Sequence, residues 1–383
     1  IYYIHMEINV KSEKEEAIKK ELAGKHDPES KRLIRFLEMP DLSRTPGSPI
    51  YEIARRIAGL EIFKNFDVIR VPEIIDTYTF FELFDFPKDH PVRSRSDSYF
   101  IGDANIMRAH TTIMWYYYLN ESIVKKKIAD GQPIGSLCYG KVYRKDEIDR
   151  QHMNVFHQMD GWYLCRKSEK IIGPDELQHV LIEIAKAIFG QDIKYRFNED
   201  TFPYTDPSLE MEIEINGKWV EVLGCGVVKG NVLKNLGVDS EIYNGWAFGF
   251  GLERLAIISM ELPDIRLLWS EDERVKHQLK LGTKFKEVSK FPPITRDVSF
   301  VVDKIFVPNN YFDLIRDIGG NLVEEVKLLD KYENPEKFGP DKISYTYRII
   351  YRSNGRTLES IEVDLLQDKI YQETKSQFGA EVR

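Results

Sequence analysis

Two segments carry residue types suited to work on a nucleotide. Residues 140–146 read Gly-Lys-Val-Tyr-Arg-Lys-Asp, and residues 156–161 read Phe-His-Gln-Met-Asp-Gly. An arginine on one strand and an aromatic side chain on the next make a surface on which ATP can lie across a sheet. Arg144 would neutralise an α-phosphate as charge builds during attack, and Phe156 would stack on adenine. Taken alone, such pieces more often form ordinary half-exposed strands.

A third segment favours a nucleotide site over ordinary half-exposed strands. Residues 246–255 read Trp-Ala-Phe-Gly-Phe-Gly-Leu-Glu-Arg-Leu. The small residues in it allow close approach to the backbone, and Arg254 stands at the start of an expected helix. From there its guanidinium would cover the other face of adenine. The three segments together predict an ATP site.

Strands must position these side chains. Alternating apolar and polar residues with many aromatic and β-branched side chains predict antiparallel strands over 136–164 and 194–228. Helical spacing predicts a helix over 175–189, and residues 246–260 end as a buried helix. Further expected elements are helix over 12–37 with a break at 26–28, helix over 49–58 and a strand over 66–72. The expectation is a large sheet flanked by helices.

The C-terminal part repeats a different pattern. After a charged run at 270–280, read as a helical linker, the chain alternates strands and helices. The expected elements are a strand at 294–302, a helix at 311–318, strands at 323–332 and 344–351, and a helix at 361–378. If the tail adds an edge strand, the order is β-α-β-β-α-β, which is ferredoxin-like.

Composition limits the class of protein. The 383 residues suit a large domain and a smaller one, and the net charge of −8 argues against a protein that coats nucleic acid through a basic surface. Cys138, Cys165 and Cys225 lack metal-ligand spacing, which favours a reducing compartment. No apolar run is long enough to span a bilayer, so a soluble protein is expected. The opening residues are neither a signal nor a transit peptide, and a processed chain is expected.

The segments described above resemble motifs 2 and 3 of class II aminoacyl-tRNA synthetases. Within that class, residues 156–158 and the run Trp-Val-Glu-Val-Leu-Gly-Cys-Gly at 219–226 resemble the phenylalanyl-tRNA synthetases. The stretches 90–93, 108–112 and 202–208 are similar to others in that family. Residues 290–300 and 356–363 resemble the ferredoxin-fold anticodon-binding domain. Its direct fusion to the catalytic domain resembles the organellar, single-chain type.

The resemblance implies an α+β chain with an antiparallel class II sheet flanked by helices. Its expected parts are an N-terminal helical extension (1–46), the catalytic domain (47–269), a linker (270–285) and the anticodon-binding domain (286–383). It also implies a monomer that needs no partner subunit, uses ATP and Mg²⁺, and joins phenylalanine to tRNA(Phe) without a membrane. The mitochondrial matrix or another organelle stroma is the expected location.

Roles at the site follow from the same resemblance. Arg144 and Arg254 are the catalytic residues. The expected ATP site comprises Arg144, Asp146, Phe156, Glu221, Gly251 and Arg254, with Glu221 also at the magnesium ion. The expected phenylalanine site comprises His110, Thr112, Gln158, Asp160, Phe202, Tyr204, Gly224 and Ala247. Contacts with tRNA are expected from Arg296, Lys327, Arg348 and Arg356.

Four positions depart from the family pattern: Asp160 replaces a usual Glu, Thr112 a usual Ser, Tyr204 a usual Phe and Ser96 a Trp of bacterial enzymes. The Tyr204 hydroxyl needs a partner if buried. Considered one at a time, His110 is more often a structural histidine and Cys225 more often a packing residue. His157 on its own can simply brace its strand. Two rival functions stay open: an enzyme that passes its adenylate to something other than tRNA, and a noncatalytic RNA-binding relative.

Overall fold

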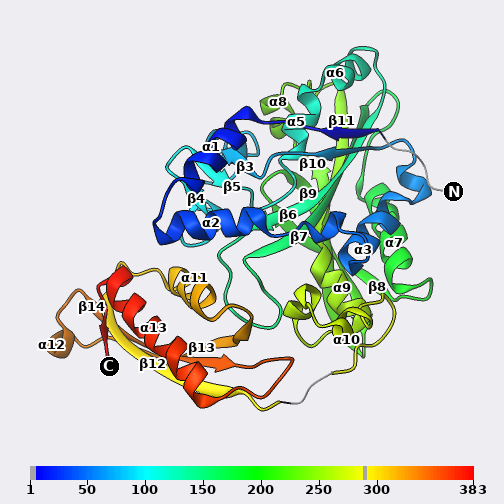
Figure 1. Ribbon diagram of the computed structural model, residues 1–383. Helices are drawn as coiled ribbons and strands as arrows, with labels where there is room; N and C mark the ends of the chain where they lie inside the picture. The colour runs from blue at the N-terminus through cyan, green and yellow to red at the C-terminus, as the bar shows by residue number, and fades with distance from the viewer. Residues whose placement is uncertain (1–5, 288–290) are drawn as a thin grey trace. The chain divides into compact units, whose positions relative to one another are not determined.

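The computed structural model describes residues 6–287 and 291–383 (Figure 1). The chain forms two compact units. Among the described residues, the first consists of residues 6–144, 155–262 and 279–284, and the second of residues 145–154, 263–278, 285–287 and 291–383. In the described ranges no helix has both the length and the apolar character needed to cross a bilayer.

The first unit is built on an eight-stranded sheet with the order β1-β2-β6-β7-β11-β10-β9-β8. The strand bounds are β1(Glu7–Asn9), β2(Asp67–Arg70), β6(Ile134–Tyr143), β7(Val155–Arg166), β8(Tyr195–Phe202), β9(Thr205–Ile215), β10(Lys218–Val228) and β11(Tyr243–Gly251). From β6 to β8 every pair is antiparallel, as expected, but β1 pairs with β2 and β2 with β6 in parallel. The sheet is therefore mixed rather than wholly antiparallel.

Helices and a small sheet surround these strands. The small sheet has the order β3-β5-β4, with β3(Ile74–Asp76), β4(Phe100–Ile101) and β5(Asn105–Met107). The helices are α1(Glu13–Ala23), α2(Pro28–Glu38), α3(Pro49–Ala58), α4(Thr77–Phe81), α5(Met114–Asn120), α6(Ser122–Ala129), α7(Pro174–Phe189), α8(Gly230–Asn235) and α9(Leu252–Met260). Three short 3-10 helices are η1(Leu42–Arg44), η2(Glu61–Phe63) and η3(Pro91–Arg93).

Helix α3 illustrates how local sequence sets these bounds. The Ser48 side chain caps it by accepting a hydrogen bond from the backbone N–H of Ile50, and Pro49 occupies the first turn. Ile50, Ile53 and Ile57 are then buried at helical spacing. Helices α3, α7 and α9 pack together on one side of the sheet (Figure 1).

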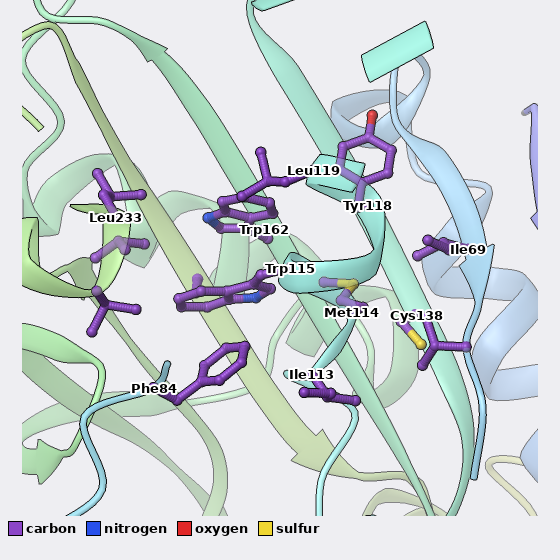
Figure 2. Close-up of a cluster of buried hydrophobic side chains, with 14 of the residues drawn as sticks. Ile69, Phe84, Ile113, Met114, Trp115, Tyr118, Leu119, Cys138, Trp162 and Leu233 are labelled. Carbon is purple, nitrogen blue, oxygen red and sulfur yellow. The ribbon is translucent and has the colours of Figure 1, made fainter. Parts of the chain in front are cut away.

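The opposite face of the sheet carries a core of aromatic and aliphatic side chains (Figure 2). Trp115 from α5 stacks on Trp162 from β7 with ring centroids 5.1 Å apart, and Phe84 lies against Trp115. Side chains alternate along a strand, so Phe156, Gln158 and Asp160 point to the same face as Trp162. The residues expected to hold substrates therefore share a face with a rigid core.

The second unit has a four-stranded antiparallel sheet with the order β13-β14-β12-β15. Its strands are β12(Ile294–Asp303), β13(Val323–Tyr332), β14(Lys342–Tyr351) and β15(Glu381–Val382). Its helices are α10(Glu273–Lys276), α11(Pro308–Gly319), α12(Pro335–Phe338), α13(Ser360–Phe378), η4(Ile265–Trp269) and η5(Gly320–Leu322). The tail supplies the edge strand, so the ferredoxin-like order is confirmed. The expected helical linker at 270–280 is helical only in α10.

Candidate active site

A row of small residues lies on the sheet face beside the expected substrate residues. In the pairing of β7 with β11, Gly251 stands opposite Gln158, Gly249 opposite Asp160 and Ala247 opposite Trp162. A Cβ atom at Gly249 would come within 2.0 Å of Asp160 Oδ1, whereas at Gly251 it would meet no protein atom within 4 Å. Glycine at 249 thus makes room for the carboxyl group, and Gly251 leaves the face next to Gln158 uncovered.

Asp160 is the centre of a buried polar cluster. Its carboxylate accepts hydrogen bonds from the hydroxyls of Thr111 and Thr112, the latter at 3.3 Å. Only 3% of the residue is exposed. Burial raises the pKa of Asp160 to about 7, because the two hydroxyls and the nearby arginines only partly offset the loss of water. Such a carboxyl group can change its charge when a cation arrives.

His110 and Gln158 bring unpaired polar atoms to the same region. Both ring nitrogens of His110 and the Oε1 atom of Gln158 are buried and have no hydrogen-bond partner among the described residues. The imidazole stacks on Phe80 at 4.4 Å. Burial, reinforced by the charge of Arg144, lowers the pKa of His110 to about 3, so the ring is neutral at physiological pH. Buried polar atoms are usually paired, so a bound ligand is a natural partner.

Aromatic side chains border this cluster. The rings of Phe202 and Tyr204 stack with centroids 6.4 Å apart, and Trp115 meets Tyr204 edge-on at 5.7 Å. A Cβ atom at Gly224 would approach the Phe202 ring to 2.8 Å. Burial raises the pKa of Tyr204 to about 12, against a lowering by its hydrogen bond with Thr112. The Tyr204 side chain therefore lies next to Thr112 of the polar cluster.

The expected nucleotide residues of the first unit are more exposed and already paired. Arg144 donates from Nε to the carbonyl of Ala109 at 2.9 Å, and its guanidinium lies 5.3 Å from the centre of the Phe156 ring. Arg254 forms an ion pair with Glu221 at 3.2 Å, in which both side chains are about half exposed. Each guanidinium is thus held in a defined place by groups that a phosphate or a base can replace.

Two carboxylates stand directly opposite each other next to Arg254. Glu221 of β10 pairs with Glu212 of β9, and Arg196 forms an ion pair with Glu212. Within the described ranges no three His, Cys, Asp or Glu side chains gather as a metal-binding group. A cation here would depend on one or two carboxylates and on oxygens supplied by a ligand.

Asp146 differs from the other expected nucleotide residues because it belongs to the second unit. It lies in the segment 145–154, between β6 and β7. Its carbonyl accepts a hydrogen bond from Arg316 Nη1 at 3.1 Å, and Asn154 donates to the buried Asp313 carboxylate at 2.6 Å. This segment is therefore anchored on helix α11.

The four basic residues expected to contact tRNA are all ion-paired. Arg348 binds Asp297 through two nitrogens at 2.7 and 2.8 Å, and Lys327 stands next to Arg348 in the pairing of β13 with β14. Lys327 pairs with Glu325, Arg296 with Asp364 and Arg356 with Glu362. Lys327 and Arg348 thus lie side by side, whereas Arg296 and Arg356 pair with helix α13.

Three residues near the site were not singled out from the sequence. Thr111 donates to Asp160, Trp115 packs on Tyr204, and Arg108 is buried with its guanidinium against the carbonyls of Lys141 and Val71. All three lie in or just after residues 108–112, one of the stretches that resemble the family. The three cysteines are buried free thiols, and burial raises the pKa of Cys225 to about 12, as suits a packing residue.

Comparison with known proteins places both parts of the chain in families. The model of the class II core domain (F) of tRNA synthetases matches residues 37–279, and that of the ferredoxin-fold anticodon-binding domain matches residues 289–383. The chain is 38% identical to the chloroplastic/mitochondrial phenylalanine–tRNA ligase of Arabidopsis thaliana, over 78% of this chain and 68% of that protein. It is 34% identical to the mitochondrial phenylalanine–tRNA ligase of Mus musculus, over 84% and 76%, and 31% identical to that of Saccharomyces cerevisiae, over 84% and 83%.

Proposed function

Because the chain belongs to the phenylalanine–tRNA ligases of the organellar type, we propose that the buried cluster around Asp160 binds the head group of phenylalanine and that Arg144 and Arg254 bind ATP. The activity is the ATP-dependent joining of phenylalanine to tRNA.

The unpaired Oε1 atom of Gln158, on the same strand face as Asp160, carries the amino-acid assignment. An ammonium group placed between them donates to Gln158 Oε1, which has no partner among the described residues, and its positive charge stabilises the ionised form of Asp160. Thr112 and His110 border the same position. The phenyl ring then extends toward Phe202, Tyr204, Gly224 and Ala247, whose apolar surfaces suit it.

The nucleotide assignment rests on the paired but exposed arginines. Adenine stacks between the Phe156 ring and the Arg254 guanidinium, which gives up its contact with Glu221. A carboxylate oxygen of phenylalanine attacks the α-phosphorus, the bond to the bridging oxygen breaks, and pyrophosphate leaves. Arg144 neutralises the negative charge that builds on the α-phosphate during this exchange. The open backbone at Gly251 completes the part of the proposed ATP site that lies in the first unit.

Magnesium fits this arrangement through Glu221, with Glu212 opposite it. Mg²⁺ keeps several waters and needs only one or two protein carboxylates when phosphates supply further oxygens. When bound, it supplies positive charge to the phosphates of ATP. The carboxylate of Glu221 becomes available to it once Arg254 turns to the base.

The second unit is proposed to bind tRNA(Phe) through Arg296, Lys327, Arg348 and Arg356. Each must exchange its carboxylate partner for a phosphate, which makes binding dependent on salt. The proposal further includes a monomer in the mitochondrial matrix or another organelle stroma, since the relatives named above carry mitochondrial or chloroplastic names.

The test of this function has two stages. Pyrophosphate exchange with each of the twenty amino acids should show strong dependence on phenylalanine, and labelled phenylalanine should then be transferred to organellar tRNA. Exchange without transfer would favour an enzyme that passes its adenylate elsewhere. Absence of exchange in a folded protein would favour a noncatalytic RNA-binding relative.

A further inference from the structure

His157 lies on the side of β7 opposite to the proposed substrate residues. The side chain is completely buried, and its two ring nitrogens contact different elements. Nδ1 lies 2.6 Å from Glu253 Oε1, at the start of α9. Nε2 accepts a hydrogen bond of 2.9 Å from the backbone N–H of Leu42, at the start of η1, and lies 3.5 Å from the Asp41 carboxylate.

These contacts assign the proton of the imidazole. Because Nε2 accepts a hydrogen bond from a backbone N–H, it carries no proton of its own. The proton is therefore on Nδ1, which donates to the Glu253 carboxylate. The backbone N–H of His157 donates to the same carboxylate, at 2.9 and 2.8 Å from its two oxygens. His157 thus holds Glu253 with two donors.

Glu253 is placed where it controls the direction of Arg254. It is the second residue of α9, and the N-cap residue Gly251 offers this helix no side-chain cap. Successive residues of a helix point about 100° apart, so a fixed Glu253 fixes the direction in which Arg254 leaves the first turn. Arg254 indeed reaches Glu221 on β10, the strand next to β11 in the sheet.

We infer that His157 and Glu253 form a positioning pair for Arg254: the neutral imidazole, protonated at Nδ1, holds the first turn of α9 so that the Arg254 guanidinium is aimed at the adenine site. The inference rests on the proposed assignment of Arg254 to ATP. His157 touches no substrate. Its effect reaches the nucleotide through Glu253 and the turn of helix that follows.

Two replacements of His157 separate this role from simple packing. In His157→Asn the side-chain amide nitrogen takes the place of Nδ1 and can still donate to Glu253. In His157→Gln the amide reaches the place of Nε2, so it can meet Leu42 but leaves Glu253 without the side-chain donor. Glu253→Gln removes the carboxylate itself while it keeps the shape of the side chain.

The measurement is the KM for ATP and the KM for phenylalanine in pyrophosphate exchange, together with the melting temperature. We expect His157→Gln and Glu253→Gln to raise the KM for ATP by about tenfold or more. The scale is taken by analogy from metal sites, where removing a residue that orients a ligand costs about tenfold or more in affinity. The KM for phenylalanine should stay within about threefold of the parent. In His157→Asn, which keeps a donor to Glu253, the KM for ATP should stay within about threefold of the parent value.

Tyr118→Phe provides the matched control, since it removes a buried hydroxyl that donates to the Asp67 carboxylate at 2.6 Å on another part of the sheet. It should lower the melting temperature and leave the KM for ATP unchanged. The inference is overturned if His157→Asn and His157→Gln behave alike, or if Tyr118→Phe raises the KM for ATP as much as they do. A parent protein without phenylalanine-dependent exchange would instead overturn the proposed function.

Discussion

The amino-acid end and the nucleotide end of the proposed site prepare for their ligands in opposite ways. At the amino-acid end, Asp160 and His110 are buried, and the ring nitrogens of His110 and the buried Oε1 atom of Gln158 have no partner among the described residues. At the nucleotide end, Arg144 and Arg254 are already bonded to a carbonyl and to a carboxylate. Polar atoms at the amino-acid end gain hydrogen-bond partners when the ligand binds, whereas the arginines at the nucleotide end exchange the partners that they already have.

This difference has energetic consequences. A buried polar group without a partner costs free energy that a correctly placed ligand recovers, so the amino-acid end discriminates strongly against ligands that lack an ammonium group. An exposed ion pair contributes little by itself, so its exchange for a phosphate or a base has a small cost. The first arrangement favours selectivity, and the second favours turnover of a highly charged substrate.

The largest effect is expected at the nucleotide end. Arg144→Ala should lower pyrophosphate exchange at least about a hundredfold, because it removes one preorganised contact to the charge that builds on the α-phosphate. The fold should persist, which circular dichroism and the melting temperature would check. Exchange within a few-fold of the parent would mean that this strand does not serve ATP.

The next effect tests the buried carboxyl group at the amino-acid end. Asp160→Asn should raise the KM for phenylalanine about thirtyfold at pH 8, as expected for a lost hydrogen bond to a charged group of about 2 kcal/mol. Since burial raises the pKa of Asp160 to about 7, the parent carboxyl is increasingly neutral below that pH. The gap between the two proteins should therefore narrow toward pH 6. A gap independent of pH would argue against a raised pKa.

The apolar wall should give a smaller change in selectivity. Ala247 faces Trp162 and is nearly buried. Removing its methyl group in Ala247→Gly should improve exchange with para-substituted phenylalanines by about tenfold relative to phenylalanine, the usual scale for one methyl group in a pocket. Unchanged ratios would place the para position against another wall.

Tyrosine should be activated measurably by the parent, because an apolar pocket rejects an added hydroxyl only about a hundredfold.

The smallest effect is expected in the second unit. Arg348→Ala should lower tRNA charging by a few-fold, leave pyrophosphate exchange unchanged and reduce the salt slope of tRNA binding by about one. Because Arg348 already forms an ion pair with Asp297, the loss of that pair offsets much of the free energy that Arg348 gains by contacting a tRNA phosphate. Asp297→Ala is the informative partner variant, since it frees Arg348 and should strengthen binding. An equal loss in both variants would point to damage of the sheet.

Local sequence signals predicted the elements that carry the site. The bounds of α3 follow from Pro49 and the spacing of its isoleucines, and the alternation in residues 155–166 indicated which side chains of β7 share a face. Of the first-unit residues expected from the family resemblance, Phe156, Gln158 and Asp160 of β7 and Ala247 and Gly251 of β11 share that face of the sheet. Their roles remain proposals, but their placement needed no information beyond motif and period.

Contacts between distant segments could not be predicted in this way. The sequence marks neither the hydrogen bond between Thr111 and Asp160 nor the one between His157 and Glu253, because 49 and 96 positions separate the partners. The parallel strand β1 has only three residues, too few to show a period. The anchoring of Asp146 through Arg316 depends likewise on tertiary packing.

Proton release on phenylalanine binding tests the contrast between the two ends most directly. Calorimetry in two buffers of different ionisation enthalpy counts the protons exchanged. If the pKa of Asp160 is about 7 in the free protein and the group is ionised beside the ligand's ammonium group, binding at pH 6 should release up to roughly 0.9 proton, and at pH 8 roughly 0.1. ATP binding should show no release that depends on Asp160. An equal proton count at both pH values, or a count that persists in Asp160→Asn, would contradict the account.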